Sequence, residues 1–477
     1  MQVKSMFFKQ SASMKLDDPA LQESLRKFKG KFVDARARAV AEVDAWEAVR
    51  SHAARLRDRT IANLDAYLVE FERNATRRGA QVHWAETAEE ACTIIAEIAR
   101  ANGVKKVTKS KSMVSEEVNL NDKLEAAGIK VVETDLGEYI LQLANEPPSH
   151  IVAPAVHKSK EEVADLFQAA HHKPRLTDIP AMTREAREAL REHFLTADMG
   201  ISGSNFVIAE TGTTLTVTNE GNADLVTTVP RIHCVITGIE KVIPTLEDFA
   251  TLIRLLPRSA TGQAIANYLT LTTGTRAPGE TDGPEQMHIV LVDAGRSKFL
   301  GGDMEAMLRC IRCGACMNHC PVYQNVGGHA YGWVYPGPMG SVLTPTYVGI
   351  ENAGDLPNAA TFCGECAVVC PVKIPLPDLM RKLREKQFDL KLRPWSERAG
   401  VVMWSYAARR PKLYAALTKI AARVASWMGG RNKLIHSLPG LDGWTKGRDM
   451  PAPEGKTFRE LYRESQKRKA SSAEGRR

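Results

Sequence analysis

Seven of the nine cysteines in this 477-residue chain lie between Cys310 and Cys370. An even spread would put about one cysteine in a segment of that length, so the clustering needs a chemical explanation. Disulfides are a poor one, because the chain has no export signal and thiols inside a cell stay reduced. Whatever fold the chain adopts must therefore bring these thiols to a metal or to an iron–sulfur core.

The first cysteine run reads Cys310-x2-Cys313-x2-Cys316-x3-Cys320-Pro321. This spacing is typical of bacterial ferredoxins, in which three thiolates hold one 4Fe–4S cluster and the fourth cysteine reaches a neighbouring cluster. The proline stops the local helix and turns the chain away. A structural zinc site uses paired C-x2-C units, and a triplet crowds its thiolates too closely for that alternative.

The second run is shorter by one ligand. It reads Cys363-x2-Cys366-x3-Cys370-Pro371, and the position three residues before Cys363 holds Ala360. Crossed ligation then predicts two sets. Cluster 1 takes Cys310, Cys313, Cys316 and Cys370, and cluster 2 takes Cys320, Cys363 and Cys366. Cluster 2 is either a three-iron form, or its last iron takes a non-cysteine, solvent or distant ligand.

Other residues near the motif and elsewhere offer weaker signals. Cys92 and Cys234 have apolar neighbours, which favours buried core thiols over ligands. His319 is a conceivable ligand or tuner of cluster 2, although a surface position explains it too. The 42 residues between Cys320 and Cys363 are rich in glycine and aromatic side chains. We expect them to cover a cluster, with an ordinary packed loop as the alternative.

Upstream of the cysteines, short apolar runs alternate with helical patterns, which predicts an α/β domain with a largely parallel sheet. A helix is expected after the capping residue Thr87, and others across 116–126 and 139–144. The Thr211-Gly212 step indicates a hairpin, so the sheet should be mixed. Strands are predicted at Gln81–Ala85, Val104–Thr108, Ile129–Glu133, His150–Ala153, Cys234–Ile239 and His288–Val292.

These patterns predict an α/β plus α architecture of four regions. They are a helical region at 1–79, an α/β domain at 80–297, a helical ferredoxin module at 298–377, and a basic helical segment at 378–477. Residues 466–477 are polar and are expected to form a disordered tail.

Charge is distributed unevenly along the chain. The chain carries a net charge of +8, and from residue 378 to the end there are 24 Lys and Arg against 10 Asp and Glu. This basic end suits an acidic partner or an anionic membrane surface, although a solvated helical face explains it as well. Nucleic acid is not expected, because no recognised motif accompanies the charge. No apolar run is long enough to span a membrane, so a soluble, cytoplasmic protein is predicted.

A substrate-oxidising site is not visible in the sequence. Glycine-rich nucleotide fingerprints, a P-loop and a zinc-protease motif are all missing, so no catalytic residue is assigned and the chain is predicted to be an electron carrier. Acidic and small polar residues gather in Glu133–Glu138 and Glu210–Thr214, at predicted strand ends. They indicate either a ligand site or turn formation and helix capping.

Several long motifs resemble those of a known family. They are Glu133-Thr-Asp-Leu-Gly-Glu-Tyr139, Pro148-Ser-His-Ile-Val-Ala-Pro154, Ile208-Ala-Glu-Thr-Gly-Thr213, Thr218-Asn-Glu-Gly-Asn-Ala-Asp-Leu225, Gly238-Ile-Glu-Lys241, Val326-Gly-Gly-His-Ala-Tyr-Gly332 and Cys363-Gly-Glu-Cys-Ala-Val-Val-Cys-Pro-Val-Lys-Ile-Pro375. Along nearly its whole length the chain is similar to the lactate utilization protein B family, the iron–sulfur subunits of a bacterial L-lactate oxidation system.

This resemblance implies an α/β domain of the lactate-utilization type, similar to cyclo-ligase folds, followed by a ferredoxin module. It also implies partner subunits, one of them rich in Cys-Cys-Gly motifs, and no such motif occurs in this chain. The shortened second cysteine run is the usual form in the family, so the missing eighth ligand is expected.

Three functions follow as hypotheses. In the first, the chain relays electrons within a multi-subunit system that oxidises L-lactate to pyruvate and allows growth on lactate. In the second, it serves another oxidoreductase complex, of the glycerol-phosphate or heterodisulfide type. In the third, the clusters are structural or redox-sensing, and the α/β domain binds a small molecule.

Overall fold

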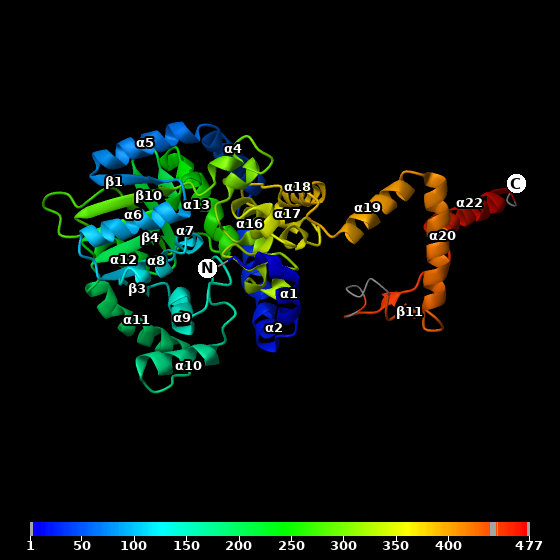
Figure 1. Cartoon of the computed structure of the whole chain (residues 1–477), viewed down its shortest axis with the longest axis horizontal. Helices are drawn as coiled ribbons and strands as arrows, with labels where there is room; N and C mark the ends of the chain where they lie inside the picture. Colours follow the sequence, from blue (N-terminus) through cyan, green and yellow to red (C-terminus); the bar gives the residue numbers. More distant parts are fainter. Residues whose placement is uncertain (1–2, 439–444, 446, 475–477) are drawn as a thin grey trace. The chain divides into compact units, whose positions relative to one another are not determined.

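The structure is a computed structural model that describes residues 3–438, 445 and 447–474. The chain forms two compact units, Met1–Gln387 and Phe388–Arg477, and each is described here by itself. Figure 1 shows the order of their helices and strands.

Six parallel strands form the central sheet of the first unit, called sheet A (Figure 1). Every residue of its third strand is buried, as expected for a parallel sheet covered on both faces. The α/β architecture predicted from the alternating pattern is confirmed. In spatial order the strands are β1 (Ala80–Ala85), β10 (Gln286–Val292), β7 (Ile232–Gly238), β4 (Met199–Gly203), β2 (Lys106–Lys109) and β3 (Lys130–Glu133).

Helices cover both faces of sheet A. Side chains alternate along β10, so that Ile289 and Leu291 join one core while Val290 and Val292 join another. Helix α5 (Leu64–Arg77) packs on the first face through its apolar stripe. The second face is covered by α6 (Ala88–Ala101), α7 (Met113–Glu117) and α8 (Leu120–Ala126). Thr87 caps α6 by accepting the Glu90 N–H, as its position predicts.

A second, smaller sheet, sheet B, lies beside sheet A. Its order is β8 (Val242–Ile243), β5 (Phe206–Ile208), β6 (Thr213–Thr218) and β9 (Tyr268–Thr272). The β5–β6 pair is the predicted hairpin, and it is antiparallel, whereas β5 and β8 are parallel. Gly212 has a φ of +69°, and a Cβ there would meet the backbone nitrogen of Ala75 at 2.2 Å. Glycine is therefore required where the hairpin turn approaches α5.

The remaining helices of the α/β region flank these sheets. A helical lobe buries Val132 at the β3 edge of sheet A. The lobe consists of α9 (Leu136–Ala144), α10 (Lys160–His171) and α11 (Ile179–Leu195). Two further helices, α12 (Asn222–Thr228) and α13 (Leu246–Ala260), connect strands of the two sheets.

The N-terminal helices and the cysteine region share one hydrophobic core, which also includes sheet B. The N-terminal helices are α1 (Phe8–Leu16), α2 (Pro19–Arg26), α3 (Asp34–Ala41) and α4 (Trp46–Ala62). The cysteine region contains α14 (Ala315–Asn318), α15 (Tyr323–Val326), α16 (Gly337–Tyr347), α17 (Glu365–Val368) and α18 (Leu376–Asp389), with short 3-10 turns between them. The region is therefore built into the body of the first unit.

The second unit is mostly helical. It contains α19 (Trp395–Ala408), α20 (Pro411–Met428), a two-stranded pair β11 (Leu434–Ile435) and β12 (Met450–Pro451), and α22 (Phe458–Glu474). Among the residues that the structure describes, no helix is both long and apolar enough to cross a membrane.

Three local predictions are corrected by the structure. Residues 150–153 form bends instead of a strand, because the His150 ring accepts the N–H groups of Val152 and Ala153 and curls the chain. The single helix expected over 116–126 is two helices, interrupted by Asn119 in the left-handed region (φ 59°). Of the polar tail, 466–474 continue α22, since the sequence is rich in good helix formers; 475–477 lie outside the described residues.

Candidate functional site

The two cysteine runs have the same local backbone. In each, a non-glycine residue in the left-handed region, Arg312 (φ 56°) or Phe362 (φ 55°), precedes a cysteine. A left-handed glycine follows, and then a one-turn helix, α14 or α17, that carries the next cysteine. Two left-handed positions on either side of one cysteine wrap the chain in a tight turn, so each run presents its thiols towards one centre.

The thiols predicted for cluster 1 interact with one another electrostatically. Burial raises the pKa of Cys316 well above its ordinary value, and the nearby Cys310, Cys313 and Cys370 raise it further. Burial likewise raises the pKa of Cys313 to about 12 and of Cys370 to about 11. These four residues are the set that crossed ligation assigns to one cluster.

The thiols predicted for cluster 2 also lie together. Burial raises the pKa of Cys366 to about 12, and Cys320 and Cys363 add to this effect. All three line a small cavity of about 20 Å³, which His319 and Phe362 also border. Cys366 also raises the pKa of Cys316, and α14 packs against α17. The two thiol sets are therefore adjacent.

Backbone N–H groups point at several of these sulfurs. Ile374 donates to the Cys370 sulfur at 3.3 Å, and N–H groups of Ala315 and Tyr323 favour the thiolates of Cys313 and Cys320. Such donors stabilise negative sulfur and help to set the potential of a cluster. Burial alone favours the protonated thiols. The N–H donors favour the thiolates, which are the form that binds an iron–sulfur cluster.

Arginines from the N-terminal helices hold the second cysteine run in place. The Arg50 guanidinium donates to the Cys370 carbonyl oxygen at 2.6 Å and 3.0 Å, and Arg36 donates to the Val369 carbonyl at 3.0 Å. Both side chains are almost completely buried. Their positive charges favour the thiolates of Cys370 and Cys313, and they would offset the charge of a cluster with four thiolate ligands.

The segment between the two runs is folded instead of loop-like. It contains α15 and α16, and Tyr323, Tyr331 and Tyr335 are fully buried in it. Tyr331 lies close enough to Cys320 and Cys316 for both to raise its pKa, after burial as the main cause. Its hydroxyl interacts with the Cys320 sulfur and makes no hydrogen bond to an oxygen or nitrogen atom of the described residues. The segment packs against Cys316 and Cys320, which are buried, whereas Cys363 is exposed, so the covering hypothesis holds for part of the cysteines.

Cluster 2 has no fourth cysteine nearby in the described part of the chain. Cys92 and Cys234 belong to the core between sheet A and α6, and burial raises their pKa values to about 11 and about 12. His319 Nδ1 donates to the Ala315 carbonyl oxygen at 2.9 Å, so Nδ1 carries the hydrogen of the neutral ring and Nε2 keeps a free lone pair. Within the described residues, no three His, Cys, Asp or Glu side chains form a group suited to a single metal ion.

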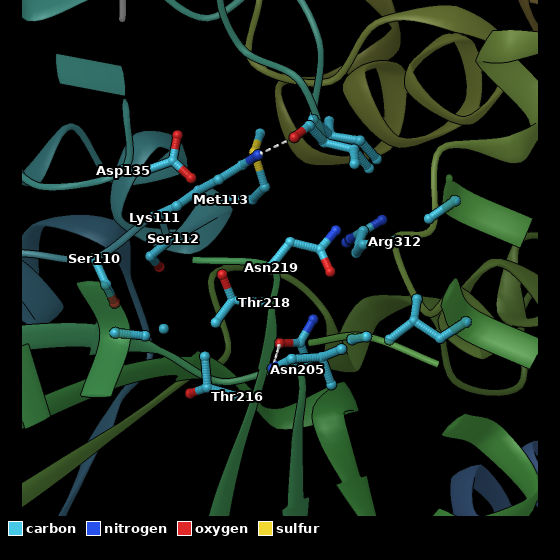
Figure 2. A pocket seen from close by; sticks show the side chains of 18 of the residues that line it. Ser110, Lys111, Ser112, Met113, Asp135, Asn205, Thr216, Thr218, Asn219 and Arg312 are labelled. Carbon is cyan, nitrogen blue, oxygen red and sulfur yellow. Dashed lines mark hydrogen bonds between the residues drawn. The ribbon is translucent and has the colours of Figure 1, made fainter. Parts of the chain in front are cut away.

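A cavity of about 360 Å³ opens where the strands of sheet A end. Figure 2 shows Ser110, Lys111 and Ser112 after β2, Asp135 after β3, and Asn205 after β4 around it. This is the edge at which ligands bind in parallel α/β sheets. The opposite wall comes from the cysteine region and includes Arg312, Cys313 and Tyr335, so the cavity borders a predicted ligand of cluster 1.

The acidic residues at the strand ends take different roles. Asp135 lines the cavity and caps α9, while Glu210 accepts the Leu246 N–H at the start of α13. Glu133 lies 2.8 Å from the fully buried Lys109 ammonium, and burial raises the pKa of Glu138 beside them well above its usual range. Of this predicted group, Asp135 reaches the cavity, Glu210 caps a helix and Glu133 pairs with Lys109, whereas both carboxyl oxygens of Glu138 lack a hydrogen-bond partner among the described residues.

Sequence reasoning missed several cavity residues. Glu220 and Lys241 lie within the family motifs 218–225 and 238–241, and Arg312 lies in the first cysteine run, but the sequence assigned none of them to a cavity. Burial raises the pKa of Glu220 to about 7, and the nearby Asp135 adds to the effect. Lys241 is 6% exposed. The available signal was their place directly after strands, since Glu220 follows β6 and Lys241 follows β7.

Comparisons with known proteins agree along the chain. Three family profiles match: "LUD domain" over residues 68–292, "4Fe-4S dicluster domain" over 306–374, and "Lactate utilisation protein B, C-terminal" over 381–467. The lactate utilization protein B of Lysinibacillus sphaericus (strain C3-41) is 43% identical over 95% of both chains. That of Geobacillus kaustophilus (strain HTA426) is 44% identical over 90% of both.

Two further matches are less informative about function. The uncharacterized electron transport protein YkgF of Escherichia coli (strain K12) is 40% identical over 96% of this chain and 97% of its own. A solved DUF162 family protein from Deinococcus radiodurans is 14% identical, covers 48% of this chain and 98% of its own, and has a TM-score of 0.27.

Proposed function

The chain belongs to the lactate utilization protein B family, and from this we propose that it is the electron-transfer subunit of a multi-subunit system that oxidises L-lactate to pyruvate. The family and the dicluster domain support an iron–sulfur electron-transfer role in lactate utilisation. The further proposal is that the chain is a subunit of a complex that allows growth on lactate.

The observation that carries the proposal is the adjacency of the two thiol sets. When bound, a 4Fe–4S cluster accepts and releases one electron, so two clusters can take the electron pair that oxidation of a hydroxy acid releases. The chain's own residues supply the holding thiolates, the N–H donors and the arginines. Buried aromatic side chains such as Tyr331 and Tyr323 exclude water between the two sets.

We propose that Cys310, Cys313, Cys316 and Cys370 bind cluster 1, and that Cys320, Cys363 and Cys366 bind cluster 2. His319 borders the cavity of the second set with Nε2 available, which supports it as a candidate for the fourth position. Iron and sulfide counts with electron paramagnetic resonance of anaerobically purified protein test this inventory. Two interacting 4Fe–4S signals are expected; a colourless protein with zinc or no metal contradicts the proposal.

Matched cysteine variants sharpen the test. Cys316→Ser removes a proposed ligand and should lower the iron content by the equivalent of one cluster. Cys92→Ser changes a buried thiol in another core and should leave the iron content unchanged. Equal iron loss in both variants would mean that misfolding, and not ligation, causes it.

The choice of electron donor distinguishes the functions. With partner subunits present, L-lactate should reduce the clusters, and without the partners it should not. Reduction by glycerol 3-phosphate instead would assign the chain to another oxidoreductase complex. Clusters that no physiological donor reduces would indicate a structural or sensing role.

We also propose a cytoplasmic location and partner subunits, including one rich in Cys-Cys-Gly motifs. The second unit supports contact with an acidic partner or an anionic membrane surface. Its helices α19 and α20 carry exposed Trp395, Trp404 and Trp427 among basic residues such as Arg409 and Lys412. Exposed aromatic and cationic side chains on the same helices are typical of interfacial helices.

A further inference from the structure

The cavity at the end of sheet A contains a buried ammonium group without a counter-ion. Lys241 lines the cavity and is 6% exposed, yet its ammonium makes no hydrogen bond or ion pair within the described residues. The nearest carboxylate, on Glu240, is already bound by Arg296 at 2.6 Å. Burying an unpaired charge is costly, so this position favours an anion that the protein does not itself provide.

A second cation faces the same cavity. Arg312 stacks over the Tyr335 ring at 4.6 Å, and its contact with Glu240 is long, at 3.5 Å. A guanidinium has five N–H donors, so Arg312 keeps donors for a ligand. Figure 2 shows Arg312 directed into the cavity. Together the two side chains form a cationic end of the cavity, next to Cys313.

Polar atoms elsewhere in the cavity are also unused. The Ser110 hydroxyl and the Asn222 carbonyl oxygen are buried without any hydrogen-bond partner among the described residues. Asn205 accepts the Val217 N–H through its oxygen, and its NH₂ group makes no hydrogen bond in the described part of the structure. Buried polar atoms are rarely left unpaired, so the two such atoms of Ser110 and Asn222, in residues that line one cavity, indicate a polar ligand.

The far end of the cavity has two carboxylates and one ammonium group. Asp135 and Glu220 lie there with Lys111, whose ammonium donates to the Val152 carbonyl oxygen at 2.7 Å, and Glu220 accepts the Leu136 N–H at 3.1 Å. A carboxylate pair repels a doubly charged phosphate more strongly than a singly charged carboxylate. The same pair can accept a hydrogen bond from a hydroxyl group. This polarity favours one orientation of a ligand, with its anionic group at Lys241 and Arg312.

We propose that this cavity binds a small hydroxy- or oxo-carboxylic acid, with its carboxylate at Lys241 and Arg312 and its oxygen function among Ser110, Asn205 and Asn222. A volume of about 360 Å³ lies at the lower end of the range for small-molecule sites. The ligand lies against Cys313, and therefore beside cluster 1. The choice of acid rests on the proposed function, and the inference adds the place in the chain where that class of substrate binds.

Calorimetry on the full, anaerobically prepared protein tests the proposal. The probes are L-lactate, D-lactate, pyruvate, propionate and inorganic phosphate. We expect lactate or pyruvate to bind, and propionate, which lacks the oxygen function, to bind more weakly. Binding of either acid should also change the resonance signal of reduced cluster 1, because the ligand lies against Cys313.

Two variants locate the site. Lys241→Gln should weaken acid binding about tenfold or more, since it removes a charged donor. Ser110→Ala loses no internal hydrogen bond and should weaken binding several-fold, so it serves if the first variant folds poorly. Lys298→Gln, at an exposed position, is the control and should bind normally.

Several results would overturn the proposal. One is that none of the acids binds, or that phosphate alone does. Another is that Lys241→Gln binds acids normally and changes only the potential of cluster 1, which would mean that the lysine serves the cluster. Acid binding without electron transfer from lactate would instead contradict the proposed function and leave this inference standing.

Discussion

Tyr331 is fully buried near Cys320 and Cys316, and its hydroxyl lies next to the Cys320 sulfur. In the cluster-loaded protein we expect it to donate to the Cys320 sulfur, and a donor to a ligand sulfur stabilises the reduced state. Tyr331→Phe should therefore lower one reduction potential by about 40 mV, which corresponds to roughly 1 kcal/mol.

A redox titration followed by electron paramagnetic resonance measures this shift. Tyr323→Phe is the matched control, because its hydroxyl donates to the Ser149 carbonyl at 2.8 Å and to no sulfur. A potential that moves equally in both variants would assign the effect to general packing.

Glu220 gives a prediction about pH. Burial, with Asp135 nearby, raises its pKa from 4.5 to about 7 in the folded protein. A raised carboxyl pKa contributes stability below the unfolded pKa and loses it as pH rises towards the folded pKa. Glu220→Gln should therefore stabilise the protein progressively between pH 5 and 7, by up to about 3 kcal/mol at pH 8.

Thermal melting of wild type and Glu220→Gln across this pH range checks the prediction. Glutamine keeps the carbonyl oxygen that accepts the Leu136 N–H. Glu125→Gln, on an exposed face of α8, should show no such pH-dependent difference. A constant gap between wild type and Glu220→Gln at all pH values would count against the raised pKa.

At the level of single residues, the sequence predicted chemistry better than location. The spacing of the cysteines predicts two ligand sets, because ligand spacing within a short segment fixes local geometry. The shared cavity of Lys241 and Glu220 could not be predicted, although both lie in family motifs, since strands far apart in the sequence assemble one sheet edge.

Helix α4 illustrates how an element supports the site. Its Arg50 binds the Cys370 carbonyl, and its Arg57 donates to the carbonyls of Val242 and Leu308 at 2.8 Å and 3.0 Å. The helix thus joins sheet B to both cysteine runs. Arg50→Met should leave a buried carbonyl without its donor and cost about 2 kcal/mol.

The readout for Arg50→Met is the iron retained after timed exposure to air, together with the melting temperature. We expect faster loss of cluster 1 in the variant. Arg55 lies on the exposed face of the same helix, so Arg55→Met should behave as wild type. If both variants keep their iron equally well, α4 does not support the cluster.

Elements were predictable where periodicity was strong. The strands of sheet A and α6 match their apolar patterns and caps. The strand prediction for 150–153 was wrong because an apolar run is also compatible with a bend. The bend is caused by hydrogen bonds to the His150 ring, which a sequence pattern does not show. Likewise, Asn119 divides a helical pattern through a backbone conformation that composition alone does not reveal.

For the whole molecule, the division into two units gives a prediction. The four hydrophobic cores of the first unit include no residue beyond Leu383. A chain that ends after Leu392 should therefore fold and retain its full iron and sulfide. It should also lose any binding to vesicles that contain phosphatidylserine, measured by co-sedimentation.

Full-length protein with Lys412 and Lys419 changed to glutamine is the companion variant, because both lie on α20 and the fold of the first unit does not depend on them. Weaker sedimentation of this variant would identify charge as the cause. Vesicle binding by the truncated chain would place the membrane contact on the first unit instead.

The order of regions along the chain was predictable from motifs and composition, but their mutual packing was not. No pattern in residues 1–62 indicates that they pack against the cysteine region, some three hundred residues away, because apolar stripes do not specify which surface they cover. The shared core of the N-terminal helices and the cysteine region is therefore the main feature that only the structure reveals.

That shared core has a consequence for biosynthesis. The Lys4 N–H donates to the Gly332 carbonyl at 2.7 Å, the Ser5 hydroxyl donates to the Asn352 carbonyl at 2.7 Å, and Arg50 reaches Cys370. Helices α1 to α4 are synthesised before the cysteine region, so they can bury their apolar faces only after Cys370 has been synthesised. Contacts of such long sequence separation form late. Iron loading and closure of the N-terminal end are consequently expected to be a single, post-translational event, during which the nascent chain depends on chaperones.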